Sequence, residues 1–297
     1  MEQAKPPFVA LTIAGSDSSG GAGIQADLKS FAAHNVYGTS VITAVTSQNT
    51  VAVTDIHNIP LNMLEAQLEA VLSDFPVRAV KIGMISSEEI AALVARILSQ
   101  SDVEFVVVDT PLLSGRGDAL GGEGVVSALK EHLFPLATII TPNLHEAAEI
   151  LDEPLLQWDG ASLEDMQDKL EEQAKRLLGF GSKGVLLKGG HLFDKVSLIK
   201  DTDLNNRQVI DVYCETDHSC VFVSDWVDCP HNHGTGCALS SALAANLIYG
   251  KESGHSLEWA VEQARNWLNR CLRASQYMKL GEGPGPLNIV PVHNIDL

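Results

Sequence analysis

Short apolar runs alternate with longer segments of helical period along the chain, and this alternation restricts the possible folds more than any other feature. The first apolar run spans 8–14, and the first helical pattern spans 24–35. The run Val106-Val107-Val108 has no polar alternation, which is typical of a strand covered by helices on both faces. The sequence therefore predicts an α/β fold of three layers, with a central, mainly parallel sheet flanked by helices on both faces.

The same pattern continues through the rest of the chain. Strands are predicted at 41–47, 77–82, 103–109, 138–141 and 184–188, with an alternating pair within 51–59 and antiparallel strands within 196–227. Helices are predicted at 61–73, 88–98, 124–133, 163–178, 235–249 and 257–277. No repeat, low-complexity tract or linker interrupts this order, so we expect residues 1–297 to form a single domain.

The charge of the chain limits its partners. Its 20 lysines and arginines stand against 38 aspartates and glutamates, which gives a net charge of −18. Such a surface repels phosphate backbones, so nucleic acid is not expected as a partner. An anionic ligand would need local help from backbone N–H groups, a few placed cations or a metal ion.

The compartment is predicted from patterns that are missing. Residues 1–7 do not have the pattern of an export signal, and no run of about 20 apolar residues could span a membrane. The five cysteines are an odd number and widely spaced, and no Asn-x-Ser/Thr sequon accompanies them, which favours free thiols. We expect a cytoplasmic protein with no membrane partner.

A glycine-rich stretch, 15–23, lies between the first predicted strand and the first predicted helix. In an open α/β sheet, ligands bind at such turns beyond the carboxyl ends of strands. Nine small or polar residues exceed what a tight turn needs, which favours a ligand site over a plain turn. Gly21, Gly23 and Ala26 match the dinucleotide-binding spacing only loosely, because no acidic residue ends a second strand about 20 residues later.

The segment 233–242 predicts a glycine turn that opens a helix rich in small residues. Its first N–H groups would form an anion hole, and the positive helix end would favour the thiolate of Cys237. The simpler alternative is a plain helix cap with a packed cysteine. The consensus G-x-x-x-x-G-K-[ST] is absent, which excludes a P-loop kinase.

Polar residues follow several predicted strands. Asn143 and Glu146 could hold a hydrated Mg²⁺ between phosphates, or they could form a helix capping box. Asp109 and Lys188 end neighbouring strands, so we expect four strand ends to converge on one crevice. Gln48 closes the strand at 41–47, and its amide can pair with a ring nitrogen and the exocyclic amine beside it, unless it is only a turn residue in water.

Taken in order, these segments resemble the hydroxymethylpyrimidine/phosphomethylpyrimidine kinases of thiamine biosynthesis, a ribokinase-like family. The resemblance covers about 9–281, with matching stretches at 10–29, 41–44, 47–50, 81–84, 140–147, 187–191 and 233–237. It implies a kinase that transfers the γ-phosphoryl group of ATP to a pyrimidine hydroxymethyl group and then to the monophosphate. It also implies ATP and Mg²⁺ as cofactors, a monovalent cation as a further candidate, a small-molecule pyrimidine as substrate and a homodimer.

The resemblance assigns roles to residues by position. The residues expected to bind the pyrimidine are Gln48, Gly15, Asp27 and Met84. The residues expected at the reacting centre are Cys237 as the base, with Gly234, Thr235 and Gly236 as the anion hole. The residues expected on the cofactor side are Asn143 and Glu146, which would hold Mg²⁺, together with Lys188 and Asp109.

Two stretches depart from the family pattern. The segment 111–118 lacks the lysine that the family carries, and Arg116 is the nearest substitute, although the two cations are not equivalent at phosphates. Residues 230–232 read Pro-His-Asn where the family commonly has Lys-Asn-Thr. Both departures flank the nucleotide side, so they bear on rate and nucleotide preference more than on pyrimidine binding.

Two other functions stay open. A vitamin B6 kinase of the same fold would share the glycine turn and the 233–237 motif, but such relatives carry an apolar residue such as methionine where this chain has Gln48. A non-catalytic pyrimidine-binding protein would have lost its transfer machinery around 114–116, but Asn143, Glu146 and Cys237 argue against that loss.

Overall fold

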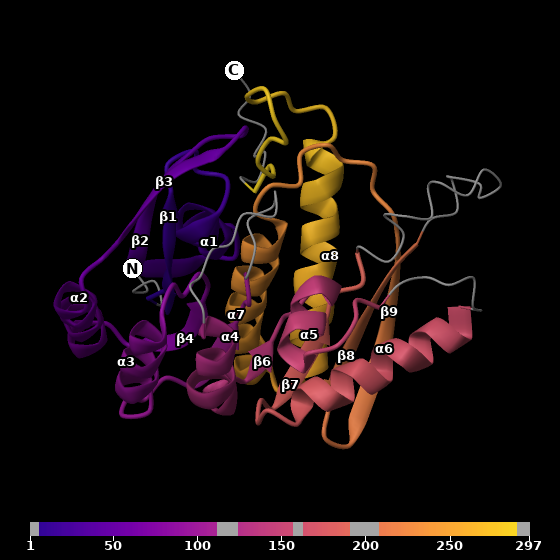
Figure 1. The fold of residues 1–297 in the computed structure, drawn as a ribbon, viewed down its shortest axis with the longest axis horizontal. Coiled ribbons are helices and arrows are strands. Elements are labelled where there is room, and N and C mark those ends of the chain that lie inside the picture. The colour runs from indigo at the N-terminus through magenta and orange to yellow at the C-terminus, as the bar shows by residue number, and fades with distance from the viewer. Residues whose placement is uncertain (1–5, 112–123, 157–162, 191–207, 290–297) are drawn as a thin grey trace, which may run out of the picture.

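One continuous sheet organises the fold. The computed structural model describes residues 6–111, 124–156, 163–190 and 208–289. In this part of the chain nine strands pair in the order β3-β2-β1-β4-β5-β6-β7-β8-β9 (Figure 1). Their bounds are β1 (Phe8–Asp17), β2 (Val36–Gln48), β3 (Val53–Asn58), β4 (Val77–Ile82), β5 (Phe105–Val108), β6 (Ile139–Ile140), β7 (Gly184–Leu187), β8 (Gln208–Glu215) and β9 (His218–Asp225).

Strand direction divides the sheet into a parallel centre and antiparallel edges. The strands β2, β1, β4, β5, β6 and β7 are parallel to their neighbours in that order. The strand β3 pairs antiparallel with β2 at one edge, and β8 and β9 pair antiparallel at the other. The prediction of a mainly parallel sheet is therefore confirmed, and the carboxyl ends of six strands share one edge.

Helices cover both faces of the sheet. Their bounds are α1 (Gly23–Ala33), α2 (Leu61–Asp74), α3 (Glu88–Leu98), α4 (Val125–Ala128), α5 (Leu144–Leu151), α6 (Leu163–Leu178), α7 (Thr235–Ser253) and α8 (Leu257–Ser275). One buried apolar cluster packs α2 to α6 against one face, and a second packs α1, α7 and α8 against the other. The valines of β5 are at most 7% exposed, because helices cover both of its faces. The predicted three-layer α/β fold is confirmed.

The strand β2 begins at Val36, five residues before the predicted start. Its first residues are not a continuous apolar run, and Val36 pairs with Phe8 of β1 in the sheet. A Cβ atom at Gly38 would lie only 2.7 Å from a methyl carbon of Leu28 on α1. The backbone pairing and this close helix contact together make the segment a strand, which local hydrophobicity does not reveal.

Other boundaries also differ from the predictions. The pair expected within 51–59 is the single strand β3. The helix expected at 124–133 is the short α4 followed by a π-helical turn, η1 (Leu129–Leu133), and a 3₁₀ turn, η2 (Phe134–Leu136), which contains Pro135. Within 196–227 the structure has β8 and β9, and the expected strand region 196–207 lies outside the described residues.

All five cysteines belong to the described part of the chain and are free thiols, as predicted. Among the helices that the structure describes, none combines the length and the apolar character that crossing a membrane would require.

Candidate active site

A cavity of about 930 Å³ lies at the carboxyl edge of the parallel strands. It is lined by residues at the ends of β1, β2, β5 and β7, by the start of α5 and by the start of α7. The predicted site residues that line it are Gly15, Gln48, Met84, Asp109, Asn143, Glu146, Lys188, Gly234, Thr235, Gly236 and Cys237. The expected convergence of strand ends on one crevice is confirmed, and a volume of this size is at the upper end for ligand pockets.

The start of α7 is locked against the glycine-rich turn after β1. Gly234 caps the helix with a left-handed φ of 84°, and a Cβ atom there would lie 1.9 Å from the carbonyl oxygen of Gly21. Only glycine fits this position. At the start of α7 the backbone N–H of Thr235 donates to the carbonyl of Asn232 at 3.3 Å, whereas those of Gly236 and Cys237 have no partner inside the helix. Thr235, Gly236 and Cys237 all line the cavity. The predicted glycine turn that opens a helix is confirmed.

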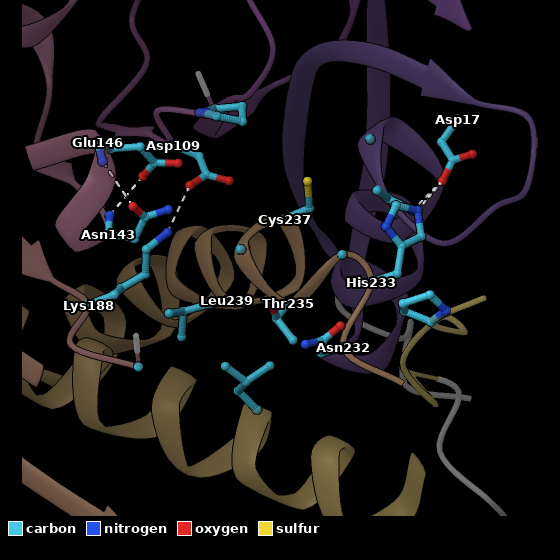
Figure 2. A pocket seen from close by; sticks show the side chains of 18 of the residues that line it. Asp17, Asp109, Asn143, Glu146, Lys188, Asn232, His233, Thr235, Cys237 and Leu239 are labelled. Atoms are coloured by element: carbon cyan, nitrogen blue, oxygen red, sulfur yellow. Dashed lines mark hydrogen bonds and ion pairs between the residues drawn. The ribbon is translucent and has the colours of Figure 1, made fainter. Parts of the chain in front are cut away.

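Cys237 lies in the middle of the cavity wall (Figure 2). The carboxylates of Glu146 and Asp109 lie on one side of it, and His233 and Asp17 lie on the other. The backbone of Gly23 forms a hydrogen bond to the Cys237 thiol. Burial raises the pKa of this thiol to about 11, although the ammonium group of Lys81 opposes the rise. Burial therefore acts against the thiolate form that the helix start was expected to favour, and it outweighs the nearby positive charge.

Asp27 does not line the cavity, which corrects its predicted place in a pyrimidine pocket. Its carboxylate is fully buried between α1, α7 and the sheet. It accepts hydrogen bonds from Thr12 Oγ1 at 2.6 Å and Ser241 Oγ at 2.8 Å, and it forms an ion pair with Lys81 Nζ at 2.9 Å. Burial alone would lower the pKa of Lys81, but the carboxylate of Asp27 raises it above its usual range. The ion pair of Asp27 and Lys81 is therefore part of the buried interior and not of the cavity wall.

Asn143 and Glu146 form the capping box that was one of the two predicted alternatives. The side chain of Asn143 accepts from the backbone of Glu146 at 2.9 Å, and Glu146 Oε2 accepts from the backbone of Asn143 at 2.7 Å. Thr110 Oγ1 also donates to Oε2, at 3.1 Å. Burial raises the pKa of Glu146 to about 7, against the effect of Lys188. Among the described residues, none donates a hydrogen bond to Oε1, so this oxygen is available to a ligand.

Asp109 and Lys188 lie on the same side of the cavity, at the ends of β5 and β7. Lys188 Nζ is 3.4 Å from Asp109 Oδ1, and Asp109 also accepts from Thr141 and Ser240. Burial would raise the pKa of Asp109, but Lys188 and Lys81 lower it below its usual value. The carboxylate is therefore ionised and paired. His191, which follows Lys188 in the predicted motif, lies outside the described residues.

Asp17 and His233 line the cavity and contact each other, although neither was among the predicted site residues. His233 Nε2 is 2.9 Å from Asp17 Oδ2 (Figure 2) and 3.3 Å from the amide nitrogen of Gln48. Both residues are adjacent to motifs that the sequence did show: Asp17 lies inside the glycine-rich stretch and His233 precedes the glycine turn of α7. Their meeting depends on tertiary structure, because 216 positions separate them.

The remaining wall of the cavity, near α8 and the edge strands, carries an apolar patch beside polar residues such as Asp211, Arg265 and Asn269. The apolar residues there include Val209, Trp226, Leu239, Leu268 and Leu272. The cavity therefore offers an amide and a histidine at one end, a helix start with a thiol in the middle, and carboxylates, a lysine and an apolar patch on the other side. Such an arrangement can hold a polar ring and a phosphorylated ligand at the same time.

Comparisons with known proteins agree with this arrangement. The sequence profile of the family "Phosphomethylpyrimidine kinase" matches residues 17–288. A curated hydroxymethylpyrimidine/phosphomethylpyrimidine kinase of Rhizobium meliloti is 39% identical over 280 residues, which cover 94% of this chain and 96% of that protein.

Solved structures show the same fold. A pyridoxal kinase from Staphylococcus aureus in complex with ADP has a TM-score of 0.80 and 30% identity, covering 98% of this chain and 96% of that one. A phosphomethylpyrimidine kinase from Clostridium difficile has a TM-score of 0.70 and 36% identity, covering 89% of this chain and 98% of that one. The ribokinase-like fold that the sequence predicted is thus confirmed. With the profile spanning most of its length and curated relatives near 39% identity, the chain belongs to the phosphomethylpyrimidine kinase family.

Proposed function

We propose that this chain is an ATP-dependent kinase that phosphorylates 4-amino-5-hydroxymethyl-2-methylpyrimidine and then its monophosphate. The observation that carries the proposal is the position of Gln48 and Cys237 in one cavity, with the start of α7 beside them. An amide can pair with the ring nitrogen and amino group of an aminopyrimidine. A helix start with free N–H groups can stabilise a transferring phosphoryl group.

The pyrimidine end of the cavity is assigned to Gln48, with Gly15 and Met84 as the walls of the ring pocket. Gly15 packs closely on Met84, because a Cβ atom at Gly15 would lie 3.1 Å from the methionine sulfur. Both residues line the cavity, and in this proposal the flat ring lies against them. The hydroxyl of the hydroxymethyl group then faces Cys237, and the thiolate form of Cys237 accepts its proton.

The phosphate end is assigned to the N–H groups of Gly234, Thr235 and Gly236 and to the ammonium group of Lys188. Phosphoryl transfer needs positioning and charge neutralisation more than covalent chemistry from the protein, and these groups supply both. The apolar patch near α8 suits the base of the nucleotide.

The donor set on this side also fits Mg²⁺. Glu146 and Asp109 provide buried carboxylate oxygens, and Glu146 Oε1 has no donor among the described residues. Hard oxygen ligands of this kind, shared with phosphates, are what Mg²⁺ prefers. We propose that Glu146 and Asp109 hold the ion with help from Asn143, whose side-chain oxygen is already used in the capping box. When bound, Mg²⁺ neutralises charge on the phosphates.

Replacing Glu146 by glutamine tests this assignment. We expect the Mg²⁺ concentration for half-maximal rate to rise about 10–100-fold, because the variant keeps the shape but loses a carboxylate. The measurement is the initial rate against Mg²⁺ at saturating ATP and pyrimidine. Glu149→Gln is the matched control, since Glu149 also lines the cavity from α5 but is exposed. Equal effects of the two substitutions would contradict the assignment.

The whole proposal is tested by coupled ADP release with Mg-ATP, with hydroxymethylpyrimidine and pyridoxal offered side by side. Turnover on the pyrimidine and slow turnover on pyridoxal is the expected result. The second candidate, a pyridoxal kinase, is favoured by the fit to the Staphylococcus aureus enzyme, and a preference for pyridoxal would establish it instead. No ADP release with either substrate, combined with pyrimidine binding in calorimetry, would indicate a binding protein without catalysis.

We also propose a homodimer formed through the β3 edge. Of the ten exposed large apolar side chains among the described residues, six lie between β2 and the start of α2: Tyr37, Val45, Val51, Ile56, Leu61 and Met63. Exposed apolar side chains gathered near the edge of a sheet are typical of a protein interface. A second copy of the chain is the partner that a self-associating enzyme would place there.

Val45→Asp is expected to convert the dimer to a monomer, because it places a charge in the centre of the buried interface. Light scattering coupled to size exclusion would show the change in mass. Val223→Asp on β9, at the opposite edge of the sheet and similarly exposed, should leave the mass unchanged. A wild-type protein that is monomeric, or a Val45→Asp variant that stays dimeric, would rule out this interface.

A further inference from the structure

Asp17, His233 and Gln48 form a connected set of polar contacts to which the proposed reaction assigns no role beyond ring binding by Gln48. Asp17 ends β1, Gln48 ends β2, and His233 lies just before α7. All three line the cavity, and Figure 2 shows the ring of His233 turned toward Asp17. The side chains of His233 and Asp17 are only 15% and 3% exposed, and their 2.9 Å separation is a direct contact.

The carboxylate of Asp17 is held ionised by several donors. It accepts hydrogen bonds from Ser19 N at 2.8 Å, Ser19 Oγ at 2.9 Å, Gly21 N at 3.1 Å and Ala22 N at 2.8 Å. Burial would raise the pKa of Asp17, but the hydrogen bonds from His233, Ser19 and Ala22 lower it below its usual value. An ionised carboxylate can only accept hydrogen bonds, so Nε2 of His233, 2.9 Å away, must carry a proton.

The ring of His233 is also fixed in place. A Cβ atom at Gly21 would lie 2.4 Å from its Cδ2 carbon, so the ring packs directly on the glycine backbone. The backbone N–H of His233 donates to the carbonyl of Gly285 at 3.2 Å. The single hydrogen on Nε2 is therefore shared between Asp17 Oδ2 at 2.9 Å and the amide of Gln48 at 3.3 Å.

This fixed donor decides which end of the Gln48 amide faces His233. The atom of the amide that lies 3.3 Å from Nε2 is assigned as its nitrogen, but two N–H donors cannot bond to each other. The two ends of an amide have the same shape, so the hydrogen-bond network determines the orientation. With the oxygen toward His233, the NH₂ group faces Thr46 Oγ1, which lies 3.2 Å from the other end of the amide and whose own hydrogen goes to the carbonyl of Ser16.

We propose that Asp17 and His233 are positioning residues that fix the polarity of the Gln48 amide, and so select a ring with an acceptor nitrogen next to an amino donor. This inference rests on the proposed function. In an aminopyrimidine the ring nitrogen and the amino group are adjacent and match the amide. In pyridoxal a methyl-bearing carbon separates the ring nitrogen from the hydroxyl, so no adjacent pair exists. An amide without the His233 contact would turn freely and lose this selection.

The test compares His233→Ala, Gln48→Ala and the double variant on both substrates. We expect His233→Ala to lower kcat/KM for hydroxymethylpyrimidine about tenfold, chiefly through KM, while kcat/KM for pyridoxal and KM for ATP change less than about twofold. In the Gln48→Ala background, removing His233 should change kcat/KM for the pyrimidine less than about twofold, because the contact that it fixes is gone. The control is His218→Ala, since His218 is exposed, pairs with Glu258 at the surface and lies outside the cavity lining. This variant should behave like the wild type.

Equal losses on both substrates, or an undiminished loss in the Gln48→Ala background, would overturn the positioning role. Nitrogen NMR of the imidazole provides a readout that needs no turnover. It should find the proton of His233 on Nε2 in the wild type, and an unprotonated Nε2 would overturn the inference. A wild-type chain that phosphorylates neither ring would overturn the proposed function instead, and the NMR result would still decide the polarity of the contact.

Discussion

Replacement of Cys237 by alanine is expected to lower kcat by about 10²–10⁴, the range that a positioned general base contributes. Cys237 lies in the cavity wall between the proposed ring pocket and the carboxylates of the phosphate side, where it can accept a proton from the hydroxymethyl group of the substrate. The binding of the pyrimidine should be unchanged, because Gln48, Gly15 and Met84 are untouched. Steady-state kinetics and calorimetry on the same variant separate the two effects.

The pH dependence gives this prediction a second readout. With the pKa of the Cys237 thiol raised to about 11, only a small fraction is thiolate at pH 7. That fraction grows tenfold with each unit of pH as long as the pH stays below the pKa, so kcat should rise with pH between about 7 and 9. Cys237→Ser should remove this slope, because a serine hydroxyl does not ionise in the range.

Cys229→Ala is the matched control, since Cys229 also lines the cavity and its thiol contacts the backbone carbonyl of His231. It should keep both the rate and the pH slope. Full turnover in Cys237→Ala would remove the base assignment, and a flat pH profile in the wild type would show that proton transfer is not part of the limiting step.

Replacement of Asp27 by leucine is expected to lower the free energy of unfolding by about 3–5 kcal/mol. The substitution leaves the ammonium group of Lys81 fully buried without its carboxylate, and the hydroxyls of Thr12 and Ser241 lose their acceptor. Urea unfolding of the purified protein measures the change. Asp27→Leu combined with Lys81→Met removes both charges together, so this double variant should recover most of the lost stability.

Glu65→Gln is the matched control for burial. Glu65 pairs with Arg96 at 2.6 Å, but both side chains are largely exposed, so its loss should cost less than about 1 kcal/mol. If Asp27→Leu also lowered the free energy of unfolding by less than about 1 kcal/mol, the structural role of the buried pair would be contradicted. If Asp27→Asn instead raised KM for the pyrimidine at unchanged stability, Asp27 would belong to the substrate site after all.

Most of the fold could be predicted where the local pattern is strong. The strand β4 and the helices α3 and α6 have the predicted bounds, because each is a regular apolar pattern bounded by proline, glycine or serine. The first part of β2 could not be predicted, since Val36 is held by pairing with β1 and Gly38 by contact with α1. Non-local pairing of this kind leaves no periodic signal in the sequence.

The candidate site divides in the same way. Cys237, Gln48 and Glu146 could be found because each lies in a motif of fixed spacing. The placement of Asp27 was wrong because a motif does not show which side of a helix faces the cavity, and α1 turns this carboxylate toward Lys81. Asp17 and His233 were missed because their contact joins the end of β1 to the start of α7.

The sequence by itself determined the α/β class, the family and most of the residues around the cavity, because strand and helix patterns and short motifs are local. The tertiary structure alone decided how charge is distributed within the site. It buried the Cys237 thiol enough to raise its pKa, and it set Lys81 against Asp27 and His233 against Asp17. Such effects depend on burial and on distances between segments far apart in the chain, and no local pattern contains them.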